Sequence, residues 1–210
     1  SWISGMTLIH LSGYLEVKEA TINSEKLFHL IGKGYTTGLS RLFFKVDDRY
    51  ESYIDKDTFV PNQFLRKINE GGYTKNQEGY FIWSTNKILV KDYKYNTEKT
   101  FSIPKNTQDI LSAFYYLRNF STIDKIKPGE SVAIDLFFDD ETTKFKLKFI
   151  GRENIKTKFG TIATMIFRPL VQSGRVFKEQ ESVTVWISDD ENKIPIRIQA
   201  SLAVGSIKAD

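Results

Sequence analysis

Two histidines are the first side chains in this sequence that could do chemistry. His10 and His29 fall on the two arms of a predicted hairpin, where they could face each other as half of a zinc site. Both lie among apolar residues, and no carboxylate or third ligand stands nearby at metal-binding spacing. A histidine that is simply packed or exposed is the commoner case, so we predict no metal site.

Three pairs of adjacent aspartates are the second candidates. They are Asp47-Asp48, Asp139-Asp140 and Asp189-Asp190, the last two extended by Glu141 and Glu191. Paired carboxylates can act as general acid and base or hold calcium. All three pairs stand at predicted strand ends or turns, where Asp bonds the local backbone, and none has the ligand spacing and glycine of a calcium loop. We interpret them as turns and predict no catalytic residue.

Other signatures of catalysis or cofactor binding do not occur. Gly32, Gly34 and Gly38 lack the spacing of a phosphate-binding loop, and no Lys-Ser or Lys-Thr pair follows at the start of a helix. No serine stands in a Gly-x-Ser-x-Gly elbow, and a chain without cysteine has no thiol nucleophile. The sequence predicts no cofactor, and the glycines indicate a flexible or bulged strand.

Cationic side chains could bind an anionic ligand, because a guanidinium pairs bidentately with phosphate or carboxylate. The arginines considered are Arg49, Arg118, Arg152, Arg168, Arg175 and Arg197. Ion pairs within the protein are the simpler expectation for them. Lys144, Lys146 and Lys148 could face anionic lipid or glycan, but a solvated sheet face explains this stripe more simply.

Aromatic residues near the middle of the chain are the remaining candidates. Phe114, Tyr115 and Tyr116 are consecutive, so on a helix they cannot share one stripe. Some of them must meet a second surface, either a sheet packed on each side of the helix or a ligand held between helix and sheet. For the second case we predict a ligand-binding set of these three residues with Arg118 and Trp186.

The helix that carries these aromatic residues is predicted over residues 106–119. Apolar residues recur there at helical spacing, and Asn106 or Thr107 can cap its start. Asp109 suits the first turn and Arg118 the last. Because large side chains occupy most sides of this helix, we expect sheet to enclose it on most of its circumference.

Alternation of apolar and polar residues predicts strands along the rest of the chain. The clearest case places Phe145, Leu147 and Phe149 on a buried face and the lysines between them on a wet one. Gly71-Gly72 suits a two-residue hairpin turn, and residues 39–44 could be a helical turn or the entry to a strand. Strands are predicted at residues 7–18, 25–36, 46–54, 62–70, 73–84, 87–95, 99–103, 131–138, 144–149, 161–167, 182–188 and 194–203.

The predicted fold class is therefore mainly β: a strongly curved antiparallel sheet, an open barrel or a sandwich of long hairpins, with one central α-helix. At 210 residues with 14 % aromatic residues, the chain suits a single domain over residues 1–210 that needs no disulfide or metal. Thirty Lys and Arg against 26 Asp and Glu give a net charge of +4 with both signs interspersed, which argues against nucleic acid as a partner. No apolar run approaches the roughly 18 residues of a transmembrane helix.

Several stretches, in this order and spacing, resemble the exported bacterial proteins of domain-of-unknown-function family 3108. They are FFKVDDRYESYID at 43–55, TQDILSAFYYLR at 107–118, GRENIKT at 151–157, GRVF at 174–177 and VWISDD at 185–190. The resemblance spans nearly the whole chain, although residues 2–14 fit the usual opening of the family poorly. It implies a β-rich fold and a periplasmic or otherwise exported location, with a signal peptide that is not part of this chain. It implies no activity and no site residues.

Three functions fit these observations. The first is a non-enzymatic envelope binding module. Its ligand would be an apolar or amphipathic molecule such as a lipid, or an envelope glycan. The second is an envelope hydrolase that uses carboxylates of acidic turns such as Asp139 or Asp189. The third is a structural partner in an envelope assembly, which predicts an exposed apolar patch. We expect a monomer, and we favour the first function.

Overall fold

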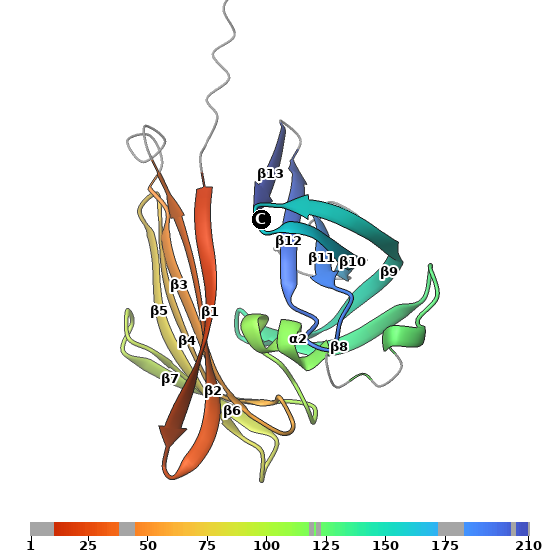
Figure 1. Ribbon diagram of the computed structural model, residues 1–210. Coiled ribbons are helices and arrows are strands. Elements are labelled where there is room, and N and C mark those ends of the chain that lie inside the picture. Colours follow the sequence, from red (N-terminus) through yellow and green to blue (C-terminus); the bar gives the residue numbers. More distant parts are fainter. Residues whose placement is uncertain are drawn as a thin grey trace, which may run out of the picture.

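The protein forms two antiparallel sheets with a short helix between them (Figure 1). The computed structural model describes residues 11–37, 45–117, 120, 123–171, 183–202 and 205–209. Within them, each sheet follows the chain order, with strands β1 to β7 in the first and β8 to β13 in the second. The predicted class, mainly β with long hairpins and one central helix, is confirmed. The described strands do not close into a barrel.

The first sheet is built from seven strands in sequence. They are β1 Leu11–Ile22, β2 Glu25–Thr36, β3 Asp47–Asp55, β4 Pro61–Glu70, β5 Tyr73–Ile82, β6 Lys87–Asp92 and β7 Thr97–Ser102. The predicted turns hold: Asn23 and Ser24 join β1 to β2, and Gly71 and Gly72 join β4 to β5, all four with positive φ. Residues 39–44 lie outside the described residues.

The second sheet has six strands and the chain reaches it through two short helices. The elements are α2 Ile110–Tyr116, the 3-10 helix η2 Ile123–Lys125, β8 Ser131–Phe138, β9 Glu141–Thr157, β10 Gly160–Val171, β11 Val183–Ser188, β12 Pro195–Leu202 and β13 Gly205–Ala209. The strand β13 was not among the predicted strands. A bulge where Phe167 pairs with Phe149 and Ile166 with Gly151 interrupts the β9–β10 ladder, and bulges bend the strand that carries them.

The helix α2 is shorter than the predicted 106–119, and its N-cap is Asp109 rather than Asn106 or Thr107. The physical reason lies in the preceding residue, because Gln108 forms a parallel bridge with Leu136 of β8. Its backbone N–H donates to Asp135 O at 2.8 Å and its carbonyl accepts from Phe137 N at 2.8 Å. An extended backbone at 108 prevents an earlier helix start. Residues 118 and 119 lie outside the described residues.

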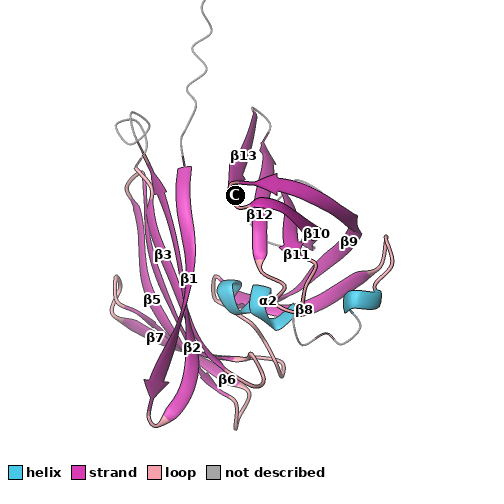
Figure 2. Cartoon of the chain, viewed as in Figure 1, coloured by secondary structure: helices cyan, strands magenta, loops and turns pink. Residues whose placement is uncertain are grey.

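Side chains of α2 pack on both sheets, and Figure 2 shows the helix between them. Leu111 and Tyr115 pack with Leu30 and Ile54 of the first sheet. Ala113 and Leu117 pack with a second cluster that contains residues of β8 to β11. All described residues of the helix are buried or half-buried, which confirms the expected enclosure and the interpretation with a sheet on each side.

Gly32 explains how α2 comes so close to the first sheet. A Cβ on Gly32 would lie 3.1 Å from Leu111 Cδ2, tighter than ordinary van der Waals contact. The ladders of β2 with β1 and β3 run through Gly32 and Gly34 without a register shift, so the expected bulge is absent from this strand. Gly32 makes room for the helix. Gly38 lies outside the described residues.

The alternation predicted in β9 is present. Leu147 is 4 % exposed and Phe149 is fully buried, whereas Lys144 is exposed. Phe145, predicted to be buried, is half-buried at the margin of the core cluster. Lys146 and Lys148 are half-buried rather than exposed, because β8 and β10 flank β9 on both sides and cover the lysine stems.

Among the described residues, no helix has the length and apolar character needed to cross a bilayer.

Replacing Leu147 by Ala should lower the free energy of unfolding by about 2 to 5 kcal/mol, because the smaller side chain leaves a cavity in the core of the second sheet. Urea unfolding monitored by tryptophan fluorescence measures the change. Lys146→Ala, on the opposite face of the same strand, is the control and should cost less than about 0.5 kcal/mol. Equal losses for the two variants would contradict the burial pattern.

Candidate functional site

The first sheet has an inner face, defined as the face that packs on the helix and on the second sheet. Phe64, Phe81 and Ile88 lie on it and pack with Phe137 of β8. Alternate residues of a strand share a face, so Tyr73, Lys75 and Gln77 continue the line of Phe81 along β5. The inner face is thus apolar where the second sheet covers it and polar beyond that cover.

The uncovered part of the inner face forms an open polar cleft of about 380 Å³. Strands β5, β6 and β7, the β6–β7 turn and the β8–β9 turn supply its walls. The lining residues are Lys75, Gln77, Val90, Asp92, Tyr95, Thr97, Lys99 and Asp140. Its volume lies in the range of small-molecule sites, and we call it the polar cleft.

The β8–β9 turn places one aspartate pair at this cleft. Asp139 and Asp140 are the two turn residues, with φ of 50° and 65°, as a tight hairpin requires. Lys75 Nζ lies 2.5 Å from Asp139 Oδ1, and Lys99 Nζ lies 3.3 Å from Asp140 Oδ2. The turn therefore has the predicted structural role and also links the second sheet to the first.

Arg66 of β4 is the second anchor of this turn. Its Nη1 lies 2.5 Å from Asp139 Oδ1, and its guanidinium carbon lies 5.7 Å from the Tyr50 ring centroid and 4.1 Å from that of Phe138. Burial opposes ionisation of Asp139, but the hydrogen bonds from Lys75 and Arg66 outweigh it and leave its pKa lowered. Asp139 is an ion-pair partner, not a proton donor.

A smaller cavity of about 30 Å³ lies under this ion pair, beside the start of α2. It has room for about two waters. Arg66, Asp139 and Leu111 are among its lining residues, and within the described part of the chain Arg66 Nε has no hydrogen-bond partner. A cavity this small between helix and sheet does not accommodate a lipid.

Asp92 accepts hydrogen bonds from β5 and from the backbone of the β6–β7 turn, two parts of the cleft wall. Its Oδ1 accepts from the backbone N–H groups of Lys94 and Tyr95 at 2.9 and 3.2 Å. Its Oδ2 accepts from Gln77 Nε2 at 3.1 Å. Such an Asx-type arrangement fixes the turn, so Tyr95 is presented in a defined position.

Asp109 joins the helix to the first sheet through a buried carboxylate. Its Oδ1 accepts from Leu111 N and Ser112 N at 2.8 and 3.0 Å, and Ser52 Oγ of β3 donates to its Oδ2 at 2.6 Å. Burial raises the pKa of Asp109 to about 6, although these hydrogen bonds favour the charged form. The sequence placed this residue at the correct helix end and missed its contact with β3.

Two other titratable clusters lie on the first sheet, and neither lines the polar cleft. A hydrogen bond with Asp48 raises the pKa of Glu70 to about 7, and burial adds to the shift. His29 Nε2 lies 2.5 Å from Glu51 Oε2, so a carboxylate stands beside this histidine, contrary to the sequence expectation. The contact arises because His29 of β2 pairs with Tyr53 of β3, and Glu51 lies two residues from Tyr53 on the same face. The described residues contain no group of three or more metal-ligating side chains, and His10 lies outside them.

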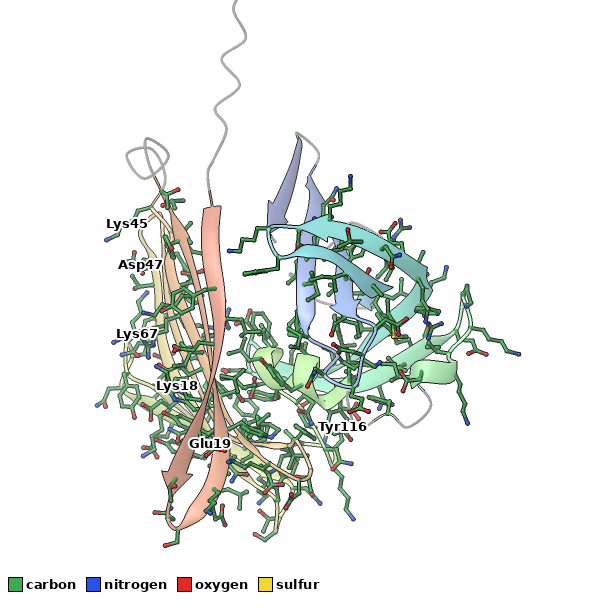
Figure 3. The ribbon with its side chains drawn as sticks, viewed as in Figure 1. Lys18, Glu19, Lys45, Asp47, Lys67 and Tyr116 are labelled. Carbon is green, nitrogen blue, oxygen red and sulfur yellow. The ribbon has the colours of Figure 1, made fainter. Side chains whose placement is uncertain are left out.

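The structure separates the predicted ligand-binding residues. Phe114, Tyr115 and Tyr116 pack as core or near-core residues of α2, and burial raises the pKa of Tyr116. Figure 3 shows Tyr116 near the helix, far from Lys45, Asp47 and Lys67 on the outer side of the first sheet.

Trp186 lies on β11 between Val185 and Ile187, which point into the core, so it occupies the opposite face of that sheet. There its Nε1 lies 2.5 Å from Glu153 Oε1. Arg118 is outside the described residues. As a binding set, these residues remain a prediction.

Several other charged candidates have structural partners, and Arg175 lies outside the described residues. Arg49 pairs with Glu51, and Arg152 Nε lies 3.0 Å from Asp189 Oδ2. Asp190 Oδ1 accepts from Ser188 Oγ at 2.7 Å. The three aspartate pairs stand on different elements, at the start of β3, between β8 and β9, and after β11. Arg66, the cation at the small cavity, was not a sequence candidate because no local pattern marks it.

Comparisons with known proteins identify the fold and no activity. A family model described as "Protein of unknown function (DUF3108)" matches residues 8–210. A comparison with curated proteins gives no match. A crystal structure of a β-barrel-like protein of the domain of unknown function DUF1849 from Brucella abortus is similar, with a TM-score of 0.57 and 12 % identity over 95 % of this chain and 86 % of that one. This likeness concerns the fold alone.

The buried Asp109 makes a specific pH dependence testable. Because its folded-state pKa of about 6 exceeds the ordinary value of 3.8, the stabilisation gained from the protonated carboxyl is complete below pH 3.8 and disappears as pH rises through 6. Asp109→Asn keeps the capping oxygen and cannot ionise. Between pH 4 and 7, the parent should lose up to about 3 kcal/mol of unfolding free energy relative to this variant. Urea unfolding at several pH values measures the difference, and parallel curves would contradict the assignment.

Proposed function

The chain belongs to the DUF3108 family of proteins of unknown function, and from that premise we propose that it is a non-enzymatic binding module of the bacterial cell envelope. Its ligand is a polar envelope glycan, held in the polar cleft. The observation that carries this proposal is the open cleft of about 380 Å³ with hydrogen-bonding walls. The envelope location is part of the proposal and follows from the resemblance to exported proteins.

The lining chemistry of the cleft suits a hydroxyl-rich ligand. Lys75 and Lys99 donate hydrogen bonds, Asp92 and Asp140 accept them, and Thr97 does both. The two cations and the two carboxylates give these four side chains a formal charge of zero. Neutral hydroxyl and amide groups can bind to such a surface without leaving a buried charge unpaired, which favours a sugar over a strongly charged ligand.

The state of the carboxylates supports binding rather than hydrolysis. Asp139 is held by two cations, Asp140 faces Lys99, and Asp92 accepts from backbone N–H groups. A hydrolase of the glycosidase type needs one carboxyl group that is protonated at working pH. The two carboxyls with such a raised pKa, Glu70 and Asp109, are not among the residues that line the polar cleft.

A lipid is the second candidate ligand, and one observation favours it. Leu15 and Val17 on β1 are 39 % and 45 % exposed, and Ile198 on β12 is 37 % exposed. Register places Leu15 and Val17 opposite Gly32 and Leu30 on the inner face, and Ile198 opposite Val185 on the core face of the second sheet. These apolar side chains would line a space between the sheets, away from the polar cleft.

Paired substitutions on the two faces of β6 and β7 test the glycan proposal. Thr97→Val with Lys99→Met alters the cleft wall on an exposed edge strand and should weaken binding at least 10-fold. The ligand is a neutral β-1,4-linked strand of four N-acetylglucosamine residues, and isothermal titration calorimetry measures its affinity.

The matched control carries the same chemical changes on the outer face. Thr100→Val with Lys91→Met lies opposite the cleft, because Thr100 pairs with Leu89 and Lys91 with Glu98. This variant should bind the strand as tightly as the parent. If the parent does not bind the glycan strand but does bind a fatty acid, and a Val17→Asp variant abolishes that binding, the glycan proposal is replaced by the lipid candidate.

A further inference from the structure

Two exposed tyrosines stand at the end of the polar cleft where β5 begins and the β6–β7 turn lies. Tyr73 is 53 % exposed and Tyr95 is 67 % exposed. The ammonium group of Lys94 lies 5.8 Å from the ring centroid of Tyr73 and 5.2 Å from that of Tyr95. One lysine thus contacts both rings, which brings the β4–β5 end and the β6–β7 turn together as an aromatic platform of these three residues.

Backbone contacts hold the platform in place. Lys94 Nζ donates to Thr74 O at 3.0 Å, and the carboxylate of Asp92 fixes the backbone N–H groups of Lys94 and Tyr95. A further bond joins Tyr93 N to Asn76 O at 2.9 Å. Because these contacts already fix the turn backbone and the Lys94 side chain, the segment loses less conformational freedom when a ligand binds, which favours affinity.

The platform and the polar cleft share one face of the sheet. Tyr95 lines the cleft and also belongs to the platform. Tyr73 lies two residues before Lys75 on β5, so both side chains point to the inner face. A ligand that fills the cleft and extends past Tyr95 therefore meets the ring of Tyr73 next.

We infer that this platform is a second subsite, which stacks on one sugar ring beyond the polar cleft, so that the ligand is an oligosaccharide longer than two sugar units. This inference rests on the proposed function. Sugars present hydroxyl groups at their edges and C–H groups on their faces. The cleft offers partners for the edges, and the exposed tyrosine rings offer flat apolar surfaces for a face.

Tyr73→Ala tests the subsite, because Tyr73 belongs to the platform and is not among the residues that line the cleft. Calorimetry compares glycan strands of two and of four β-1,4-linked N-acetylglucosamine residues. For the longer strand the affinity should fall about 3- to 10-fold, the range expected for one aromatic contact. For the two-residue strand it should not change, and Tyr73→Phe should restore the parent affinity for the longer one.

Tyr93→Ala is the matched control. Tyr93 lies in the β6–β7 turn with Tyr95 and is 50 % exposed, but its hydroxyl group donates to Glu78 Oε2 at 2.9 Å on the outer face. Its replacement should therefore change the affinity for neither glycan strand. If Tyr73→Ala leaves the four-residue strand bound as tightly as in the parent, the platform is not a subsite, while the polar cleft still stands. If the parent binds neither strand, the subsite and the proposed function fall together.

Discussion

The second sheet covers only part of the inner face of the first, and the rest of the structure follows from this incomplete cover. Where α2 and β8 lie on the first sheet, alternate residues are large and apolar, as Phe64, Phe81 and Ile88 show. Where the cover ends, the same alternation supplies Lys75, Gln77 and Asp92. Gln77 is buried there and donates to Asp92, whereas Tyr95, Thr97 and Lys99 at the edge are exposed. Burying further polar groups under the second sheet would cost free energy unless each found a partner, so the polar cleft is the partly open continuation of the core.

Ionic and hydrogen-bonded contacts set the edge of that cover. Asp139 meets Arg66 and Lys75 at the end of the β8–β9 hairpin, and Asp109 meets Ser52 at the start of α2. The first contact joins the second sheet to the first, the second joins α2 to the first sheet, and both use partly or fully buried carboxylates. They differ in their response to pH, since the pKa of Asp139 is lowered by its cations and that of Asp109 is raised by burial. The position of the second sheet, and with it one wall of the cleft, depends on these contacts.

Most of the fold could be predicted because strands and hairpin turns are local. Alternation located β8, β9 and the hairpins of the first sheet, and the Gly71-Gly72 turn chemistry located one of their joins. The helix start was misplaced because Gln108 is drawn into a bridge with β8, a contact that periodicity cannot reveal. Asp139 was correctly assigned to a turn, but its partners lie 73 and 64 residues away. The cleft itself left one usable signal, the shared face of Tyr73, Lys75 and Gln77, which sequence reasoning passed over in favour of the aromatic helix.

The central claim is that ligand contact occurs on the uncovered inner face of the first sheet, and amide chemical shift mapping tests it most directly. Two-dimensional NMR spectra of the isotopically labelled chain, recorded during titration with the four-residue glycan strand, locate the contact residue by residue. The account predicts the largest shifts within residues 73–77 and 90–99 and at Asp140, with small changes in α2 and on β11. Shifts concentrated on α2, on β1 and β12, or on the outer face would contradict it.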